Sequence, residues 1–150
     1  MERYLPTESA QLAFGAELAD RLRGHGGVVH LRGDLGAGKT TLVRGLLRAL
    51  GHQGPVRSPT YTLIEPYDAG GQRIYHLDLY RLSDPEELEL LGLRDLLDED
   101  ALLLVEWPER GHGVLPRAAL TVEIAHAPPG RRITLSPAPA WARLFAGAAL

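Results

Sequence analysis

The stretch GDLGAGKT at residues 33–40 constrains the fold more than any other part of the chain, because it matches G-x-x-x-x-G-K-[ST] at every fixed position. The apolar run Val28 to Arg32 precedes it, and Thr40 to Leu50 follows it with leucine and valine on one side. This order predicts a buried strand, a glycine turn and a helix whose positive end can hold a phosphate. A plain strand-to-helix turn would need neither the lysine nor the hydroxyl, so we favour a phosphate-binding loop.

Each residue type in this loop has a physical reason to be there. Gly36 and Gly38 allow the backbone to turn, so that several N–H groups converge on one anion. Lys39 can reach the β- and γ-phosphates of a nucleotide, and the Thr40 hydroxyl can bind Mg²⁺. Thr41 adds a donor near the α-phosphate. The expected nucleotide-binding residues of the loop are therefore Gly36, Ala37, Gly38, Lys39, Thr40 and Thr41.

Composition supports this interpretation and narrows the choice of nucleotide. Lys39 is the sole lysine among 16 basic residues, and a compact ammonium fits between phosphates where a planar guanidinium does not. A guanine-reading Asn-Lys-x-Asp motif needs a second lysine, so ATP is favoured over GTP. The absence of cysteine excludes disulfides, zinc–thiolate sites and thiol catalysis. A net charge of −3 indicates that the chain alone binds RNA poorly.

The remaining patterns predict further helices and strands. A helix is expected from a cap at Ser9 to Leu22, and the apolar run Ala101 to Glu106 predicts a central strand. Further expected elements are a hairpin of Ser58–Tyr67 and Arg73–Tyr80, helices from Ser83 to Leu91 and from Gly92 to Asp98, a hairpin of Leu120–Ala127 and Arg131–Ser136, and a C-terminal helix from Ala138 to Ala149. We therefore expect an α/β fold, a P-loop NTPase-like three-layer sandwich with a mixed, partly antiparallel sheet.

Length and hydropathy predict a simple organisation. The 150 residues suit one domain, 1–150, and no internal repeat, low-complexity tract or linker interrupts them. The N-terminus lacks the basic and apolar pattern of a signal peptide. No apolar run approaches the roughly 20 residues of a transmembrane helix. We expect a cytoplasmic protein that makes no membrane contact and forms no stable homo-oligomer.

Two carboxylates lie at or near the ends of predicted strands. Glu106 ends ALLLVE, and Asp78 lies in HLDLYRL. Away from a phosphate-binding loop, they would be a solvated strand end and the polar face of a hairpin strand. Beside such a loop, such acids are the expected partners of Mg²⁺ and of an attacking water, and which of the two binds the metal stays open. His76 lies two residues from Asp78 on the same strand face, but a solvated histidine is the simpler interpretation.

The segment SPTYTL, Ser58 to Leu63, follows the helix of the phosphate-binding loop. Its place in the chain is similar to that of a switch segment, in which a threonine senses the γ-phosphate. Taken alone, the segment is only a proline kink that enters a strand, and the residues by themselves favour this plain interpretation over a switch.

Four stretches together point to one family. They are GDLGAGKTT, SPTYTL, HLDLYRL with the following DPEELELLGLRD, and VEWPER. In combination they resemble the TsaE (YjeE) family, the P-loop ATPases of bacterial tRNA threonylcarbamoyladenosine synthesis. The resemblance spans most of the chain. It is far more specific than the loop alone, because the other three stretches are not general ATPase motifs.

The resemblance implies an activity, partners and residue roles. It implies slow Mg²⁺-dependent ATP hydrolysis, assembly with TsaB and with TsaD, which carries the transferase site, and contact with tRNA only through that complex. The ATP cycle would reset the TsaB–TsaD pair between turnovers. The implied catalytic residues are Lys39, Asp78 and Glu106. The implied metal ligands are Thr40, Glu106 and Asp78. The implied further nucleotide contacts are Ser9, Thr60, Trp107 and Arg131.

Two other classes of function stay open at this point. A small-molecule P-loop kinase usually needs a lid that brings arginines over the phosphates. Arg81, Arg94 and Arg110 are scattered and predict no such lid. A non-catalytic module would hold a nucleotide as a structural ligand and would not depend on Asp78 or Glu106.

Overall fold

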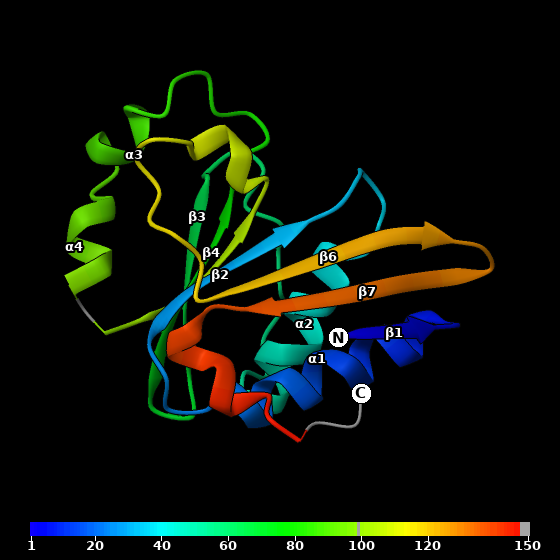
Figure 1. The fold of residues 1–150 in the computed structure, drawn as a ribbon. Coiled ribbons are helices and arrows are strands. Elements are labelled where there is room, and N and C mark those ends of the chain that lie inside the picture. Colours follow the sequence, from blue (N-terminus) through cyan, green and yellow to red (C-terminus); the bar gives the residue numbers. More distant parts are fainter. Residues whose placement is uncertain (99, 148–150) are drawn as a thin grey trace.

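The fold is built on seven strands and six helical segments, described for residues 1–98 and 100–147 in a computed structural model (Figure 1). The strands are β1 (Glu2–Leu5), β2 (Gly27–Arg32), β3 (Ile64–Ala69), β4 (Gln72–Asp78), β5 (Leu102–Glu106), β6 (Leu120–Ala127) and β7 (Gly130–Pro137). The α-helices are α1 (Glu8–Leu22), α2 (Lys39–Leu50), α3 (Glu87–Leu90) and α4 (Leu93–Asp98). Two 3₁₀ helices complete the set, η1 (Pro108–Gly111) and η2 (Pro139–Leu144).

All seven strands form one sheet in the order β1-β7-β6-β2-β5-β4-β3. The central strands β6, β2, β5 and β4 run parallel, whereas β1, β7 and β3 pair antiparallel with their neighbours. Both expected hairpins are present, because β3 pairs with β4 and β6 pairs with β7. The sheet is therefore mixed and partly antiparallel, as expected.

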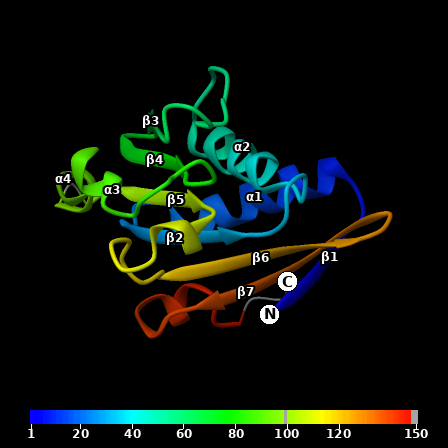
Figure 2. The ribbon, with the colours of Figure 1, turned by 90° about the horizontal axis from the view of Figure 1, so that it is seen from above.

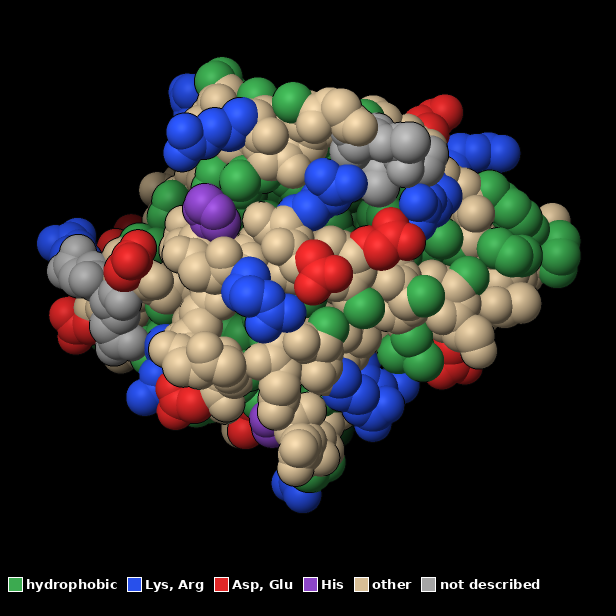
Figure 3. All heavy atoms as spheres, turned by 90° about the horizontal axis from the view of Figure 1, so that it is seen from below, with side chains coloured by type: hydrophobic (Ala, Val, Ile, Leu, Met, Phe, Trp, Pro, Cys, Tyr) green, Lys and Arg blue, Asp and Glu red, His purple; other side chains and the backbone are tan. Residues whose placement is uncertain are grey.

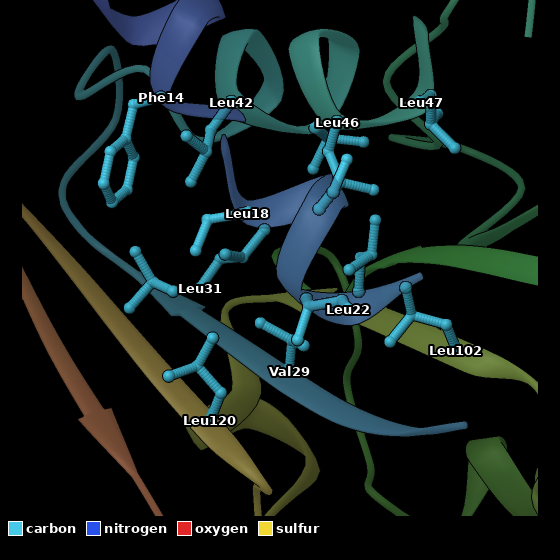
Figure 4. Close-up of a cluster of buried hydrophobic side chains, with 14 of the residues drawn as sticks. Phe14, Leu18, Leu22, Val29, Leu31, Leu42, Leu46, Leu47, Leu102 and Leu120 are labelled. Carbon is cyan, nitrogen blue, oxygen red and sulfur yellow. The ribbon is translucent and has the colours of Figure 1, made fainter. Parts of the chain in front are cut away.

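Helices α1 and α2 pack side by side on one face of the sheet (Figure 2). Figure 4 shows Phe14, Leu18 and Leu22 of α1 and three leucines of α2 facing Val29 and other strand residues, all of them buried. The opposite face carries a second cluster, which joins strands β2, β4 and β5 to the segment of α3 and α4. Sheet and helical segments thus form the three layers predicted for a P-loop NTPase-like fold.

Helix α1 begins at a different cap from the one expected. Thr7, not Ser9, is the N-cap: its backbone is extended and its hydroxyl accepts a 3.1 Å hydrogen bond from the Ala10 backbone N–H. Ser9 lies inside the first turn and is exposed. A capping hydroxyl binds an N–H two or three residues later, and Thr7 is the residue placed to do so. Strand β1, which has no counterpart in the expected elements, pairs with β7 before this helix.

Three other boundaries differ from expectation. Residues 60–62 form a turn rather than an extended strand. The Leu63 N–H bonds to the Pro59 carbonyl and the backbone of Leu63 is left-handed, so β3 begins only at Ile64. Helix α3 is one turn long, because bonds to carbonyls three residues earlier dominate before Gly92 ends it. The C-terminal helix is the 3₁₀ segment η2, which begins at Pro139 and ends at Leu144. The expected end of that helix at Ala149 lies outside the described residues.

The C-terminal segment packs on the core. Trp141 and Phe145 are buried in the cluster that α1 and α2 share with the sheet, and the Arg21 guanidinium of α1 lies 5.7 Å from the centre of the Phe145 ring. Within the described residues, none of the helices combines the length and apolar character that crossing a membrane requires.

Candidate nucleotide-binding site

The loop between β2 and α2 has the backbone shape of a phosphate cradle. Gly36 and Gly38 both have positive φ, 77° and 105°, a region that side chains disfavour. Gly38 is also the N-cap of α2, and among the described residues this helix has no side-chain capping hydrogen bond. A Cβ at this position would collide with the Gln11 side chain. The loop therefore presents unpaired backbone N–H groups at the positive end of a helix, where an anion is stabilised.

Lys39 is buried inside this loop, with 5% of its surface exposed. Its Nζ donates a 2.6 Å hydrogen bond to the Gly33 carbonyl and lies 3.7 Å from the centre of the Trp107 ring. Burial lowers the pKa of Lys39, and the nearby carboxylates of Glu106 and Asp78 act against that shift. The ammonium is therefore held at the loop by neutral groups, which a phosphate can replace.

The carboxylate of Glu106 receives two hydrogen bonds on one oxygen. The Thr40 hydroxyl of α2 donates to Oε2 at 3.1 Å, and the His76 Nε2 of β4 lies 2.5 Å from the same oxygen. Glu106 is 3% exposed, and His76 is fully buried. The interpretation of His76 as a solvated histidine is therefore wrong, because this face of β4 lies under the helices rather than in water.

Asp78 is the centre of a second set of contacts, made with the turns that precede β3. The Ser58 hydroxyl donates to Asp78 Oδ2 at 3.3 Å and lies 3.1 Å from the Thr60 hydroxyl. The Tyr80 backbone N–H donates to Asp78 Oδ1 at 3.1 Å. Thr60 thus reaches the carboxylate through Ser58, although it lies far from the loop in sequence.

Strand register brings the two carboxylates together. Asp78 is paired with Glu106 where β4 and β5 end in parallel. His76, Asp78 and Glu106 lie on the sheet face that α1 and α2 cover, since they alternate with Leu77 and Val105 of the opposite cluster. A cleft of about 420 Å³ lies above them, lined by Lys39, Thr40, Asp78 and Glu106 together with Thr60, Trp107 and neighbouring residues.

Three predicted nucleotide contacts, Ser9, Ala37 and Arg131, are not among the residues that line this cleft, and the side chain of Ala37 is fully buried. Arg131 of β7 bonds to the loop backbone, with Nε 3.0 Å from the Ala37 carbonyl and a terminal nitrogen 3.2 Å from the Gly36 carbonyl. It lines a second cleft of about 370 Å³ on the other side of the loop, next to Gln11. Ser9 lines neither cleft. The geometry thus joins Arg131 to the loop and leaves Ser9 apart from it.

The donor set of the main cleft suits a magnesium ion. Mg²⁺ prefers oxygen ligands and is usually held by one or two carboxylates, waters and substrate phosphates. Thr40, Asp78 and Glu106 offer a hydroxyl and two carboxylates. Across the residues that the structure describes, no group of three His, Cys, Asp or Glu side chains could hold a metal by itself. The residues therefore fit an ion bound together with a nucleotide rather than a metal caged by protein alone.

Several residues that line the cleft were not predicted from the motifs. Ser58, Tyr80 and Arg81 line it, and Arg81 lies 4.8 Å from the centre of the Tyr61 ring. All three lie within stretches already singled out: Ser58 in SPTYTL, and Tyr80 and Arg81 in HLDLYRL. For His76, the sequence indicated only that it shares a strand face with Asp78, because residues two apart on a strand point to the same side.

Comparisons with known proteins agree with the geometry. The model of the family described as "Threonylcarbamoyl adenosine biosynthesis protein TsaE" matches residues 5–133. The "tRNA threonylcarbamoyladenosine biosynthesis protein TsaE" of Haemophilus influenzae is 50% identical over 139 residues, which are 90% of this chain and 88% of that protein. The protein of the same name from Synechocystis is 45% identical over 113 residues, 73% of this chain and 71% of its own.

A solved structure gives the same answer for the fold. The crystal structure of Bacillus subtilis YdiB superimposes with a TM-score of 0.79 at 29% identity, covering 96% of this chain and 90% of that one. This likeness agrees with the P-loop NTPase-like architecture, and the match of the family model over most of the chain confirms the resemblance carried by the four sequence stretches. The chain belongs to the TsaE family.

Proposed function

We propose that the protein binds ATP with Mg²⁺ and hydrolyses it as the ATPase subunit of tRNA N6-threonylcarbamoyladenosine biosynthesis. One observation carries the proposal: Lys39, Thr40, Asp78 and Glu106, from three separate parts of the chain, line one cleft at the positive end of α2. A phosphate-binding loop with two carboxylates beside it is the arrangement that phosphoryl transfer to water requires.

Each of these residues has a task that follows from its chemistry. The loop N–H groups and Lys39 neutralise phosphate charge, for which Lys39 exchanges the Gly33 carbonyl for phosphate oxygens. Bound Mg²⁺ would supply further positive charge at the phosphates, and Thr40 with one carboxylate would hold it. The other carboxylate orients the attacking water and accepts its proton. Thr60 and Ser58, bonded in series to Asp78, connect the turns before β3 to this region.

We further propose that turnover is slow until partner proteins complete the site. The cleft is open to solvent along the exposed side chains of Leu35 and Tyr80, and water competes there with every electrostatic contact. A surface of TsaB or TsaD laid over this opening would exclude that water. Hydrolysis would then reset the TsaB–TsaD pair, and the transfer reaction itself would take place on TsaD.

Contact with tRNA is proposed to be indirect. Basic and acidic side chains are interspersed on the face shown in Figure 3. Arginines also pair with acids, as Arg3 does with Glu17 and Arg23 with Asp20. Together with the net charge of −3, this pattern favours recognition of tRNA by the assembly rather than by this chain.

The decisive experiment measures ATP hydrolysis by the purified protein, alone and with TsaB–TsaD. We expect stimulation by the pair, loss of hydrolysis in Lys39→Ala, and a fall of about a hundredfold or more in Glu106→Gln, the range of a lost general base or metal contact. Glu109→Gln is the matched control, because Glu109 is an exposed acid paired with Arg32 at 3.1 Å. ATP binding without hydrolysis in any setting would refute the ATPase and favour a nucleotide-holding module. A phosphorylated small molecule among the products would favour a kinase.

A further inference from the structure

The most unusual polar group in the interior is His76. Its side chain is fully buried on β4, the strand next to the β3 edge of the sheet, and Leu104 lies beside it in register on β5. Nε2 contacts the Glu106 carboxylate, whereas Nδ1 is buried and has no hydrogen-bond partner among the described residues. A buried imidazole with an unpaired nitrogen is less stable than an aliphatic side chain of similar volume. Packing alone therefore does not explain this residue.

The contact with Glu106 determines what the imidazole does. A carboxylate oxygen accepts hydrogen bonds, so Nε2 carries the proton and donates it to Oε2. The Thr40 hydroxyl donates to the same oxygen from α2. Within the described part of the chain, no hydrogen bond reaches the second oxygen of Glu106, and the residue lines the cleft. Donors from β4 and α2 thus hold one oxygen, and the other oxygen remains available to the cleft.

We propose that His76 is a positioning residue: it fixes the Glu106 carboxylate against the sheet, so that this group meets bound Mg²⁺ or its water without rearranging. The inference rests on the proposed function, and it deepens that function by assigning a residue which acts only through Glu106. A glutamate has three rotatable side-chain bonds, and a preorganised ligand loses less entropy on binding. Partners of metal ligands contribute about 10- to 100-fold in metal affinity.

The test measures Mg²⁺ dependence rather than turnover. The Kd for ATP is measured by calorimetry in EDTA and across a Mg²⁺ series, for wild type and for His76→Leu, His76→Gln and His76→Asn. The glutamine amide nitrogen reaches about as far as Nε2 and can donate to Glu106. The asparagine amide reaches only as far as Nδ1. His30→Gln is the matched control, because His30 lies on β2 but on the opposite face of the sheet.

We expect His76→Leu to raise the Mg²⁺ concentration at half effect by about tenfold or more, with the Kd in EDTA unchanged. His76→Gln should have a Mg²⁺ dependence close to that of wild type, and His76→Asn should be shifted as much as His76→Leu. On a Glu106→Ala background, His76→Leu adds no further change, since Glu106→Ala already removes the carboxylate through which His76 acts. If His76→Leu does not fold, the proposal is tested by the difference in Mg²⁺ dependence between His76→Gln and His76→Asn.

Other outcomes overturn the inference. Wild-type Mg²⁺ dependence in all three variants would mean that His76 fills space. Equal shifts in the Gln and Asn variants would mean that the donor position is irrelevant. A weaker Kd in EDTA would place the effect on the loop rather than on Glu106. If wild type itself binds ATP without any dependence on Mg²⁺, the proposed function is refuted. Wild type alone gives this result, so it is distinct from a failure of the inference about His76.

Discussion

The crossing of α1 and α2 allows a perturbation whose size follows from the structure. A Cβ added to Gly15 would lie 2.5 Å from the Leu42 carbonyl oxygen and 2.9 Å from the Leu46 backbone nitrogen, where ordinary contact begins at 3.4 Å. Both neighbours are backbone atoms and cannot rotate away. Gly15→Ala must therefore separate the two helices by almost 1 Å, and a gap of that size forfeits a quarter to a half of each dispersion contact there.

The expected magnitude is a difference of two effects. Overpacking costs about 1–3 kcal/mol, and the rigid neighbours favour the upper end. Alanine gains about 1 kcal/mol of helix propensity over glycine. We expect a net loss of about 2 kcal/mol, which lowers the Tm by about 4–8 °C in a protein of this size. Because α2 begins with Lys39 and Thr40, the same displacement should also weaken ATP binding.

Thermal and urea unfolding followed by circular dichroism measure this effect. Ala13→Gly, at an exposed position of α1, measures the difference in helix propensity between alanine and glycine in the same helix. Gly54→Ala is the control for an added methyl group that meets only the His52 side chain. A Tm of Gly15→Ala equal to or above that of wild type would refute the reasoning, because it would mean that the helices separate without loss.

Three further predictions concern titration and fluorescence. Because burial lowers the pKa of Lys39 below 10.5, ATP affinity should fall as the pH rises toward that value; a constant Kd up to about pH 10 would contradict it. Burial and the charge of Arg32 lower the pKa of His30 in the folded protein. As the pH falls below about 6.5, the imidazole is therefore protonated in the unfolded chain before it is protonated in the folded one, and the free energy of unfolding decreases. His30→Asn should therefore unfold less readily in acid than wild type, as pH-dependent Tm values will test. Trp141→Phe leaves Trp107 as the single tryptophan, and ATP should change its emission by drawing the Lys39 ammonium from the ring; calorimetric binding without such a change would count against this displacement.

Much of the fold could be predicted because its signals are local. The loop at residues 33–40, the strand before it and the helix after it are adjacent in sequence, so glycine placement and apolar periodicity indicate them directly. The two hairpins follow from turn residues between alternating runs in the same way. Local signals failed where tertiary contacts decide. Strand β1 is four residues long and exists because β7 offers a partner.

The candidate site likewise has features that the sequence determined and features that depend on the tertiary structure. The sequence by itself determined the chemistry: a single lysine in a glycine loop, a hydroxyl beside it, and carboxylates in apolar strands. Only the tertiary structure decided which of these groups meet. The register of β4 on β5 sets Asp78 beside Glu106, and the packing of α2 on the same face brings Thr40 within hydrogen-bond distance of Glu106. The same packing turned His76 from an expected surface residue into a buried donor. The physical reason is that burial and strand register depend on partners distant in the chain, which the periodicity of one segment does not encode.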